Sequence, residues 1–224
     1  MTVPGPGLAP GSGLSGRNAL VTGVSRRAGI GFAIARRLQE AGAHVFVHGW
    51  TPHDAEQAWG AEPGGTAGVA GELGVEHVEA DFADPDAPAR VVASARAALG
   101  PLDVLVVNHA RSGDGRLGEL TAEHVDAFLH ENVRASLLLV KEFAAQHAGG
   151  AGRVVLLTSG AHKQPMIREV AYAVSKGALA IATPTLAEEL ADRGITVNCV
   201  NPGPTDTGWG LAEIDPEGGF RRWA

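Results

Sequence analysis

The sequence predicts an α/β fold in which helices flank both faces of a doubly wound parallel sheet. Short runs of strand-forming residues alternate with longer Ala-rich helical patterns along most of the chain. Strands that are joined through helices form parallel sheets by right-handed crossovers. Several of the short runs (ALVTG, VLVV and VVLLT) are apolar throughout, which is typical of strands that helices cover on both faces.

Strands and helices are expected to alternate in the following order. The strands are expected at residues 18–22, 44–48, 75–80, 104–107, 153–158 and 196–200. Helical patterns cover residues 30–41, 85–99, 122–147 and 171–193. Residues 51–74 contain prolines and many glycines with little periodicity, so we expect an extended loop there with at most a short helix.

Composition and charge narrow the class of protein. The length of 224 residues, with 45% apolar and 19% charged residues, suits one α/β domain with a substantial core. The formal net charge of −7 argues against a nucleic-acid or anionic-membrane surface. No stretch is expected to be long enough to span a membrane. Residues 1–16 lack the features of a signal peptide, so we interpret them as a flexible leader before a domain at residues 17–224.

The cysteine and histidine content excludes two further kinds of site. The single cysteine, Cys199, cannot form an intrachain disulfide, which fits a reducing compartment such as the cytoplasm. The nine histidines show no spacing typical of metal ligands, so no metal site is expected.

A glycine-rich segment, TGVSRRAGIG, joins the first predicted strand to the first predicted helix. Small residues let the backbone approach a phosphate, and the helix N-terminus presents free N–H groups to it. In this position the segment predicts a dinucleotide-binding, Rossmann-type fold; a tight turn without a ligand is the alternative. The residues expected to contact the cofactor here are Gly23, Ser25, Arg26, Arg27, Gly29, Ile30 and Gly31.

The region after the second predicted strand bears on which dinucleotide binds. It reads VHGWT and has no acid before Asp54, whereas folds that prefer NAD usually place an acid there for the adenosine 2′-hydroxyl. Arg26 and Arg27 could instead meet a 2′-phosphate. We therefore expect NADP rather than NAD, with simple solvation of the arginines as the alternative.

Tyr172 is the only tyrosine, and Lys176 follows it by four residues on the last predicted helix. Residues at i and i+4 share one helix face, so the ammonium lies beside the phenol. Such a pair could donate a proton to a substrate. The alternative is an ordinary surface contact between the two side chains.

The glycine loop and the Tyr-x-x-x-Lys pair together make the chain resemble the short-chain dehydrogenase/reductase family over residues 17–209. The resemblance implies that Asn132 and Ser159, forty and thirteen residues before Tyr172, complete a catalytic set with Tyr172 and Lys176. It also implies that Tyr172 and Lys176 contact the cofactor. Further implied cofactor contacts are Asp81, Phe82, Asn108, Ala110, Pro202, Gly203, Thr205 and Thr207.

The family's activity implies hydride transfer between a nicotinamide cofactor and a small carbonyl or alcohol substrate, similar to a 3-oxoacyl reductase. In that role Tyr172 exchanges the proton and Ser159 binds the substrate oxygen. Lys176 and the nicotinamide cation would lower the pKa of the phenol from its ordinary value near about 10. Asn132 would hold a water that relays protons to Lys176. The family also implies a homodimer or homotetramer that pairs the long helices.

The sequence departs from the family pattern in three places. The glycine loop is two residues longer than usual, as in the enoyl-reductase branch, although the Tyr–Lys interval is that of ketoreductases. Val107 and His109 replace residues of the family's Asn-Asn-Ala-Gly motif. Only residues 208–224 follow Thr207, so the sheet is expected to lack the usual last strand. The alternative function is therefore a cofactor-binding relative that is catalytically silent or truncated.

Overall fold

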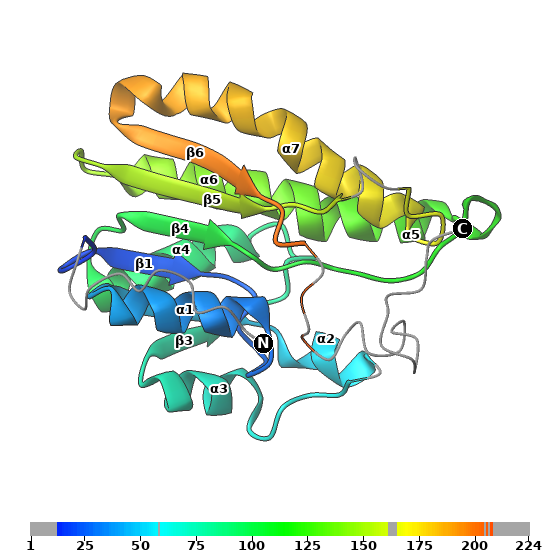
Figure 1. Cartoon of the computed structure of the whole chain (residues 1–224), viewed down its shortest axis with the longest axis horizontal. Coiled ribbons are helices and arrows are strands. Elements are labelled where there is room, and N and C mark those ends of the chain that lie inside the picture. Colours follow the sequence, from blue (N-terminus) through cyan, green and yellow to red (C-terminus); the bar gives the residue numbers. More distant parts are fainter. Residues whose placement is uncertain (1–12, 58, 161–164, 204, 206, 208–224) are drawn as a thin grey trace, which may run out of the picture.

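Six parallel strands form one sheet in the computed structural model, which describes residues 13–57, 59–160, 165–203, 205 and 207. The strand order is β3-β2-β1-β4-β5-β6 (Figure 1). The chain runs outward from β1 to β3, returns to β4 beside β1, and runs outward again to β6. This order confirms the predicted doubly wound, Rossmann-type sheet. The strands are β1 Asn18–Val21, β2 His44–Gly49, β3 Glu76–Glu79, β4 Val104–Val107, β5 Gly152–Leu157 and β6 Ile195–Val200.

Helices cover both faces of the sheet (Figure 1). Residues at alternate positions of a strand point to opposite faces, and here they belong to different core clusters. Leu20 packs with the cluster that α4, α6 and α7 cover, whereas Ala19 and Val21 pack with α1 and α3. The helices are α1 Ile30–Glu40, α2 Thr51–Glu56, α3 Gly65–Leu73, α4 Ala87–Leu99, α5 Ala122–Phe128, α6 Ala135–Gln146 and α7 Val170–Leu190.

The segment between β2 and β3 holds two helices, α2 and α3, so the expectation of an extended loop was wrong. Tertiary packing outweighs the glycine content, because Val69 and Ala70 of α3 are fully buried in the same cluster as Val45 and Val47. Gly74 then ends α3 in the left-handed conformation, with φ +66°. The glycines therefore mark the ends of elements as well as loops.

The helix expected at residues 122–147 is divided into α5, a π-helical turn at Leu129–Arg134, and α6. Such turns often accompany functional sites.

Residues Val170–Arg193 meet the length and composition of a membrane span, which the sequence was not expected to contain. A helix that packs on a sheet meets the same criterion, and Leu190 is buried in the core.

β6 is the edge strand beyond β5 in the part of the chain that the structure describes. Of the leader expected at residues 1–16, residues 1–12 lie outside the described residues, as does the segment at residues 208–224. The expectation about a missing last strand concerns this second segment.

Candidate active site

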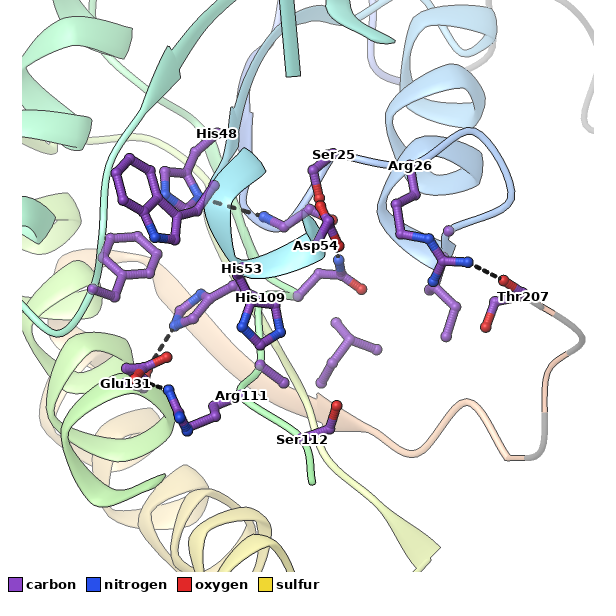
Figure 2. Close-up of a pocket in the computed structure, with 18 of the residues that line it drawn as sticks. Ser25, Arg26, His48, His53, Asp54, His109, Arg111, Ser112, Glu131 and Thr207 are labelled. Carbon is purple, nitrogen blue, oxygen red and sulfur yellow. Dashed lines mark hydrogen bonds and ion pairs between the residues drawn. The ribbon is translucent and has the colours of Figure 1, made fainter. Parts of the chain in front are cut away.

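A cavity of about 260 Å³ opens where the parallel strands end, at the point where the strand order reverses between β1 and β4. Ligands of doubly wound folds bind at this position. Figure 2 shows the cavity with side chains from the glycine loop, α2 and the segment after β6 around it. It brings together most of the cofactor-binding residues that the sequence predicted: Gly23, Ser25, Arg26, Gly29, Ile30, Asp81, Phe82, Asn108, Ala110, Tyr172, Lys176, Pro202 and Thr207.

The glycine loop is held tightly against the end of β4. Gly23 has φ +71°, and a Cβ placed on it would lie 2.7 Å from His109 Cα. Asn108 Nδ2 donates to the backbone oxygens of Thr22 and Gly23, at 3.0 and 2.9 Å. A Cβ on Gly31 would lie 2.4 Å from the Gly23 oxygen. Gly31 does not line the cavity, and its part is to let α1 pack closely against the loop.

The N-terminus of α1 faces the same loop. Gly29 is its N-cap, and no side chain caps the first turn. The first backbone N–H groups of a helix have no partner within the helix and carry a partial positive charge. The residues present therefore fit a diphosphate group.

The structure separates the two arginines of the loop. The Arg27 side chain binds Glu62 at 2.7 Å and Glu72 at 2.5 Å, and Arg27 does not line the cavity. The hydrogen bonds that Arg27 donates to Glu72 and then to Glu62 raise the pKa of its guanidinium. Arg26 does line the cavity, and its Nη2 donates to the Thr207 backbone oxygen at 2.6 Å. Only Arg26 of this pair is placed to meet a ligand.

Two buried histidines, which were not predicted as site residues, pack against Phe82 in the wall of the cavity. Phe82 lies between His48 and His109, with ring centroids 4.2 Å from each. His48 Nε2 lies 2.9 Å from the Ala80 backbone oxygen, and His109 Nδ1 lies 2.9 Å from Thr22 Oγ1. Burial lowers the pKa of His48 to about 4 and the pKa of His109 well below its ordinary value. Both rings are therefore neutral and act as scaffold. His109 was visible in the sequence as a departure from the family motif, whereas its partner His48 carried no signal.

Tyr172 and Lys176 line the other end of the cavity, and Ser159 lies beside Tyr172 without lining the cavity. Lys176 is buried, and its Nζ donates to the Leu157 backbone oxygen at 2.9 Å. The same nitrogen lies 5.9 Å from the centroid of the Tyr172 ring. Ser159 lies close enough to Tyr172 to lower the pKa of the phenol, while Ser159 Oγ donates to Met166 Sδ at 3.6 Å. The predicted pairing of phenol, ammonium and serine is therefore present in space.

The titration of this group differs from the expectation. Burial raises the pKa of Tyr172 to about 12, and the Glu169 charge adds to this effect, while the nearby Ser159 opposes it. Burial also lowers the pKa of Lys176 to about 8. The expected lowering of the Tyr172 pKa is not found in the free protein, because desolvation of the phenolate outweighs the neighbouring groups.

Asn132 lies in the π-helical turn and is fully buried. Its Oδ1 accepts from the Arg111 backbone N–H at 2.7 Å. Its Nδ2 donates to the Arg111 backbone oxygen and to Ser175 Oγ, both at 2.9 Å. An amide has two N–H donors and two oxygen lone pairs, so a single lone pair remains for a water. Asn132 thus connects the segment after β4 to α7, and Ser175 is a member of the site that sequence reasoning missed.

Gly203 and Thr205, also predicted as cofactor contacts, lie near the cavity in sequence but do not line it. The cavity instead gains residues from α2 and its flanks, among them Trp50, Asp54 and Trp59. These residues fall in the segment expected to be a loop, where no motif pointed to them. Among the described residues, no group of three or more His, Cys, Asp or Glu is arranged to hold a metal.

The profile of the short chain dehydrogenase family matches residues 17–215. The chain belongs to this family. A Bacillus subtilis (strain 168) relative, named Uncharacterized oxidoreductase YjdA, is 36% identical over 201 residues, which cover 88% of this chain and 78% of that protein. The short-chain dehydrogenase described here is therefore an oxidoreductase of the family.

Two solved structures that agree in fold with this chain contain a nicotinamide cofactor. A short chain dehydrogenase from Burkholderia cenocepacia J2315, in complex with NADP, is 39% identical with a TM-score of 0.72, covering 87% of this chain and 77% of that one. BdcA in complex with NADPH is 34% identical with a TM-score of 0.74, covering 88% of this chain and 75% of that one. This short-chain dehydrogenase therefore shares the fold of two relatives that were solved with NADP or NADPH.

Proposed function

We propose that the protein transfers hydride between NADP(H) and a small carbonyl or alcohol substrate, in the manner of a 3-oxoacyl reductase. The observation that carries the proposal is that Tyr172 and Lys176 line one end of the cavity, with Ser159 beside Tyr172. A silent cofactor-binding relative has no need of a buried ammonium beside a phenol, which costs desolvation of the charge.

The chain's own residues divide the chemistry as follows. When bound, the nicotinamide supplies or accepts the hydride. In reduction, the Tyr172 phenol donates its proton to the substrate oxygen as the carbonyl carbon gains the hydride, so that the product is an alcohol. Ser159 orients that oxygen beside the phenol, and solvent restores the proton to Tyr172. Lys176 would bind the nicotinamide ribose, and Asn132 holds α7 and the segment after β4 in register.

The choice of NADP over NAD rests on Arg26. Its guanidinium lines the cavity, whereas Arg27 is neutralised by Glu62 and Glu72. Asp81 and Phe82 would hold the adenine ring, and the first turn of α1 would hold the diphosphate. The NADP and NADPH complexes of the related structures support this choice.

We further propose a homodimer or homotetramer in the cytoplasm. Val174 and Ile181 are seven residues apart on α7 and expose 57% and 78% of their surface, and Leu137 of α6 is also exposed. Large apolar side chains at helical spacing suit a subunit contact. The free Cys199 fits a reducing compartment.

The test is a fluorescence titration of the purified chain with NADPH and, in parallel, with NADH. Tighter binding of NADPH is expected, followed by carbonyl-dependent NADPH consumption over a panel of 3-oxoacyl thioesters and simple ketones. Preference for NADH would contradict the proposal that Arg26 selects NADP, and it would leave the rest of the proposed function unchanged. Tight NADPH binding without turnover of any carbonyl would favour the silent relative, and binding of neither dinucleotide would overturn the proposal.

A further inference from the structure

A chain of contacts connects α2 to the glycine loop across the mouth of the cavity. The Asp54 carboxylate is buried, with 5% of the residue exposed, and its Oδ1 accepts from Trp59 Nε1 at 3.1 Å. The Arg26 guanidinium carbon lies 4.7 Å from the centroid of the Trp59 ring. All three residues line the cavity. Two of them, Asp54 and Arg26, are labelled in Figure 2.

This arrangement limits where the Arg26 side chain can go. An arginine on a loop samples many rotamers, but a guanidinium stacked on an indole is held by the ring face and keeps its in-plane N–H donors available. One of these donors already reaches a backbone oxygen, that of Thr207, at 2.6 Å. The indole is itself fixed by Asp54. The orientation of Arg26 therefore depends on Trp59 more than on its own loop.

The same orientation suits a phosphate. Guanidinium groups bind phosphates through parallel in-plane N–H bonds, and Arg26 lines the cavity with its guanidinium over the Trp59 ring. Arg27 cannot substitute, because Glu62 and Glu72 occupy its guanidinium. Selectivity for a cofactor with a 2′-phosphate therefore depends on Arg26 and on the residues that fix its side chain.

We propose that Trp59, anchored by Asp54, is the positioning residue that lets Arg26 recognise the adenosine 2′-phosphate. The proposal rests on the proposed function and identifies the residue outside the glycine loop that sets cofactor selectivity. It assigns Asp54 to the indole. The alternative is that Asp54 accepts a hydrogen bond from the 2′-hydroxyl of an unphosphorylated ribose, which would favour NAD. Its Oδ2 is available for this bond, because it has no hydrogen-bond partner among the described residues.

The experiment measures the affinities of adenosine 2′,5′-bisphosphate and 5′-AMP by calorimetry, so that neither the nicotinamide nor turnover enters. In the wild type the bisphosphate binds more tightly. Trp59→Leu is expected to reduce this preference about tenfold, and Arg26→Met is expected to reduce it at least as much. The double variant is expected to lose no more than Arg26→Met, because the two residues act as one unit. Trp59→Phe keeps a ring face but loses the N–H that Asp54 accepts, so its preference is expected to lie between those of the wild type and Trp59→Leu.

Trp50→Leu is the matched control, because Trp50 also lines the cavity while the Arg26 guanidinium stacks on Trp59. It is expected to weaken both nucleotides alike. Thermal melts establish that each variant folds. Asp54→Asn keeps a side-chain oxygen that can accept from the Trp59 indole, so its preference for the bisphosphate is expected to stay near that of the wild type.

Three results would overturn the inference. They are an unchanged preference in folded Trp59→Leu, additive losses in the double variant, and a selective loss of 5′-AMP binding in Asp54→Asn. Failure of the wild type to bind either nucleotide or NADPH would instead contradict the proposed function itself.

Discussion

The Lys176 ammonium donates a hydrogen bond to the Leu157 backbone oxygen at 2.9 Å, while its nitrogen lies 5.9 Å from the Tyr172 ring centroid. The charge is therefore held by the end of β5 rather than by the phenol. Burial governs the titration of both side chains in the free protein, since it lowers the pKa of Lys176 to about 8 and raises the pKa of Tyr172 to about 12.

Stability should rise with pH above the Lys176 pKa of about 8. An unfolded lysine titrates near about 10.4, so between the two values the unfolded chain binds more protons and alkali favours the folded state. From about pH 8 to about pH 9.5 the gain from this one group is roughly 1–2 kcal/mol. Tyr172 acts in the opposite direction only above about pH 10, where the unfolded phenol ionises.

Urea denaturation of the wild type and of Lys176→Met over this pH range measures the effect. The wild type should gain stability relative to the variant as the pH rises, because the variant has no ammonium to desolvate. Parallel pH profiles for the two proteins would show that Lys176 is not desolvated in the folded state.

Gly31→Ala should destabilise the protein by about 1–3 kcal/mol and weaken NADPH binding. The added Cβ would lie 2.4 Å from the Gly23 oxygen and would push α1 away from the loop. Gly71→Ala on the exposed side of α3 is the control: its Cβ meets nothing within 4 Å, so it should stabilise by up to about 1 kcal/mol. Thermal melts and NADPH titrations of both variants would contradict this account if the two substitutions behaved alike.

Asn132→Ala should cost about 2–4 kcal/mol of stability, because it leaves the partly buried Arg111 backbone groups and the buried Ser175 Oγ without their partner. Asn198→Ala, at an exposed position on β6, should change stability by less than about 0.5 kcal/mol. Chemical denaturation compares the two. A folded Asn132→Ala protein of normal stability that lost only turnover would show that Asn132 is purely catalytic.

Ile181→Asp should shift the protein toward monomer in sedimentation velocity, because it places a charge in the proposed subunit contact. Leu117→Asp is the matched control, since Leu117 is also 78% exposed but lies in a separate 3₁₀ turn. Identical sedimentation of Ile181→Asp and the wild type, both as dimers, would move the interface away from this face of α7.

Local patterns were enough to predict the sheet and most of the site. The runs around Leu20, Val106 and Leu156 are apolar because both faces of the sheet are covered, so their positions are visible in sequence. α3 was missed because its helix depends on burial of Val69 and Ala70 against distant strands rather than on its own propensity.

The remaining differences also come from tertiary contacts. Arg26 and Arg27 are adjacent and chemically identical, and only the folded positions of Glu62 and Glu72 distinguish them. In the free protein burial raises the pKa of Tyr172, an effect that the Tyr–Lys spacing does not reveal, whereas the expected lowering also involved the nicotinamide cation.

The most direct test of the account compares the wild type with Tyr172→Phe, both folded and both titrated with NADPH. Each should bind NADPH with similar affinity, since the phenyl ring keeps the packing on α7. Carbonyl-dependent oxidation of NADPH should fall by about 10²–10⁴-fold in the variant, as expected when a general acid is removed. A Tyr172→Phe protein that reduced the same carbonyl at nearly the wild-type rate would contradict the central claim.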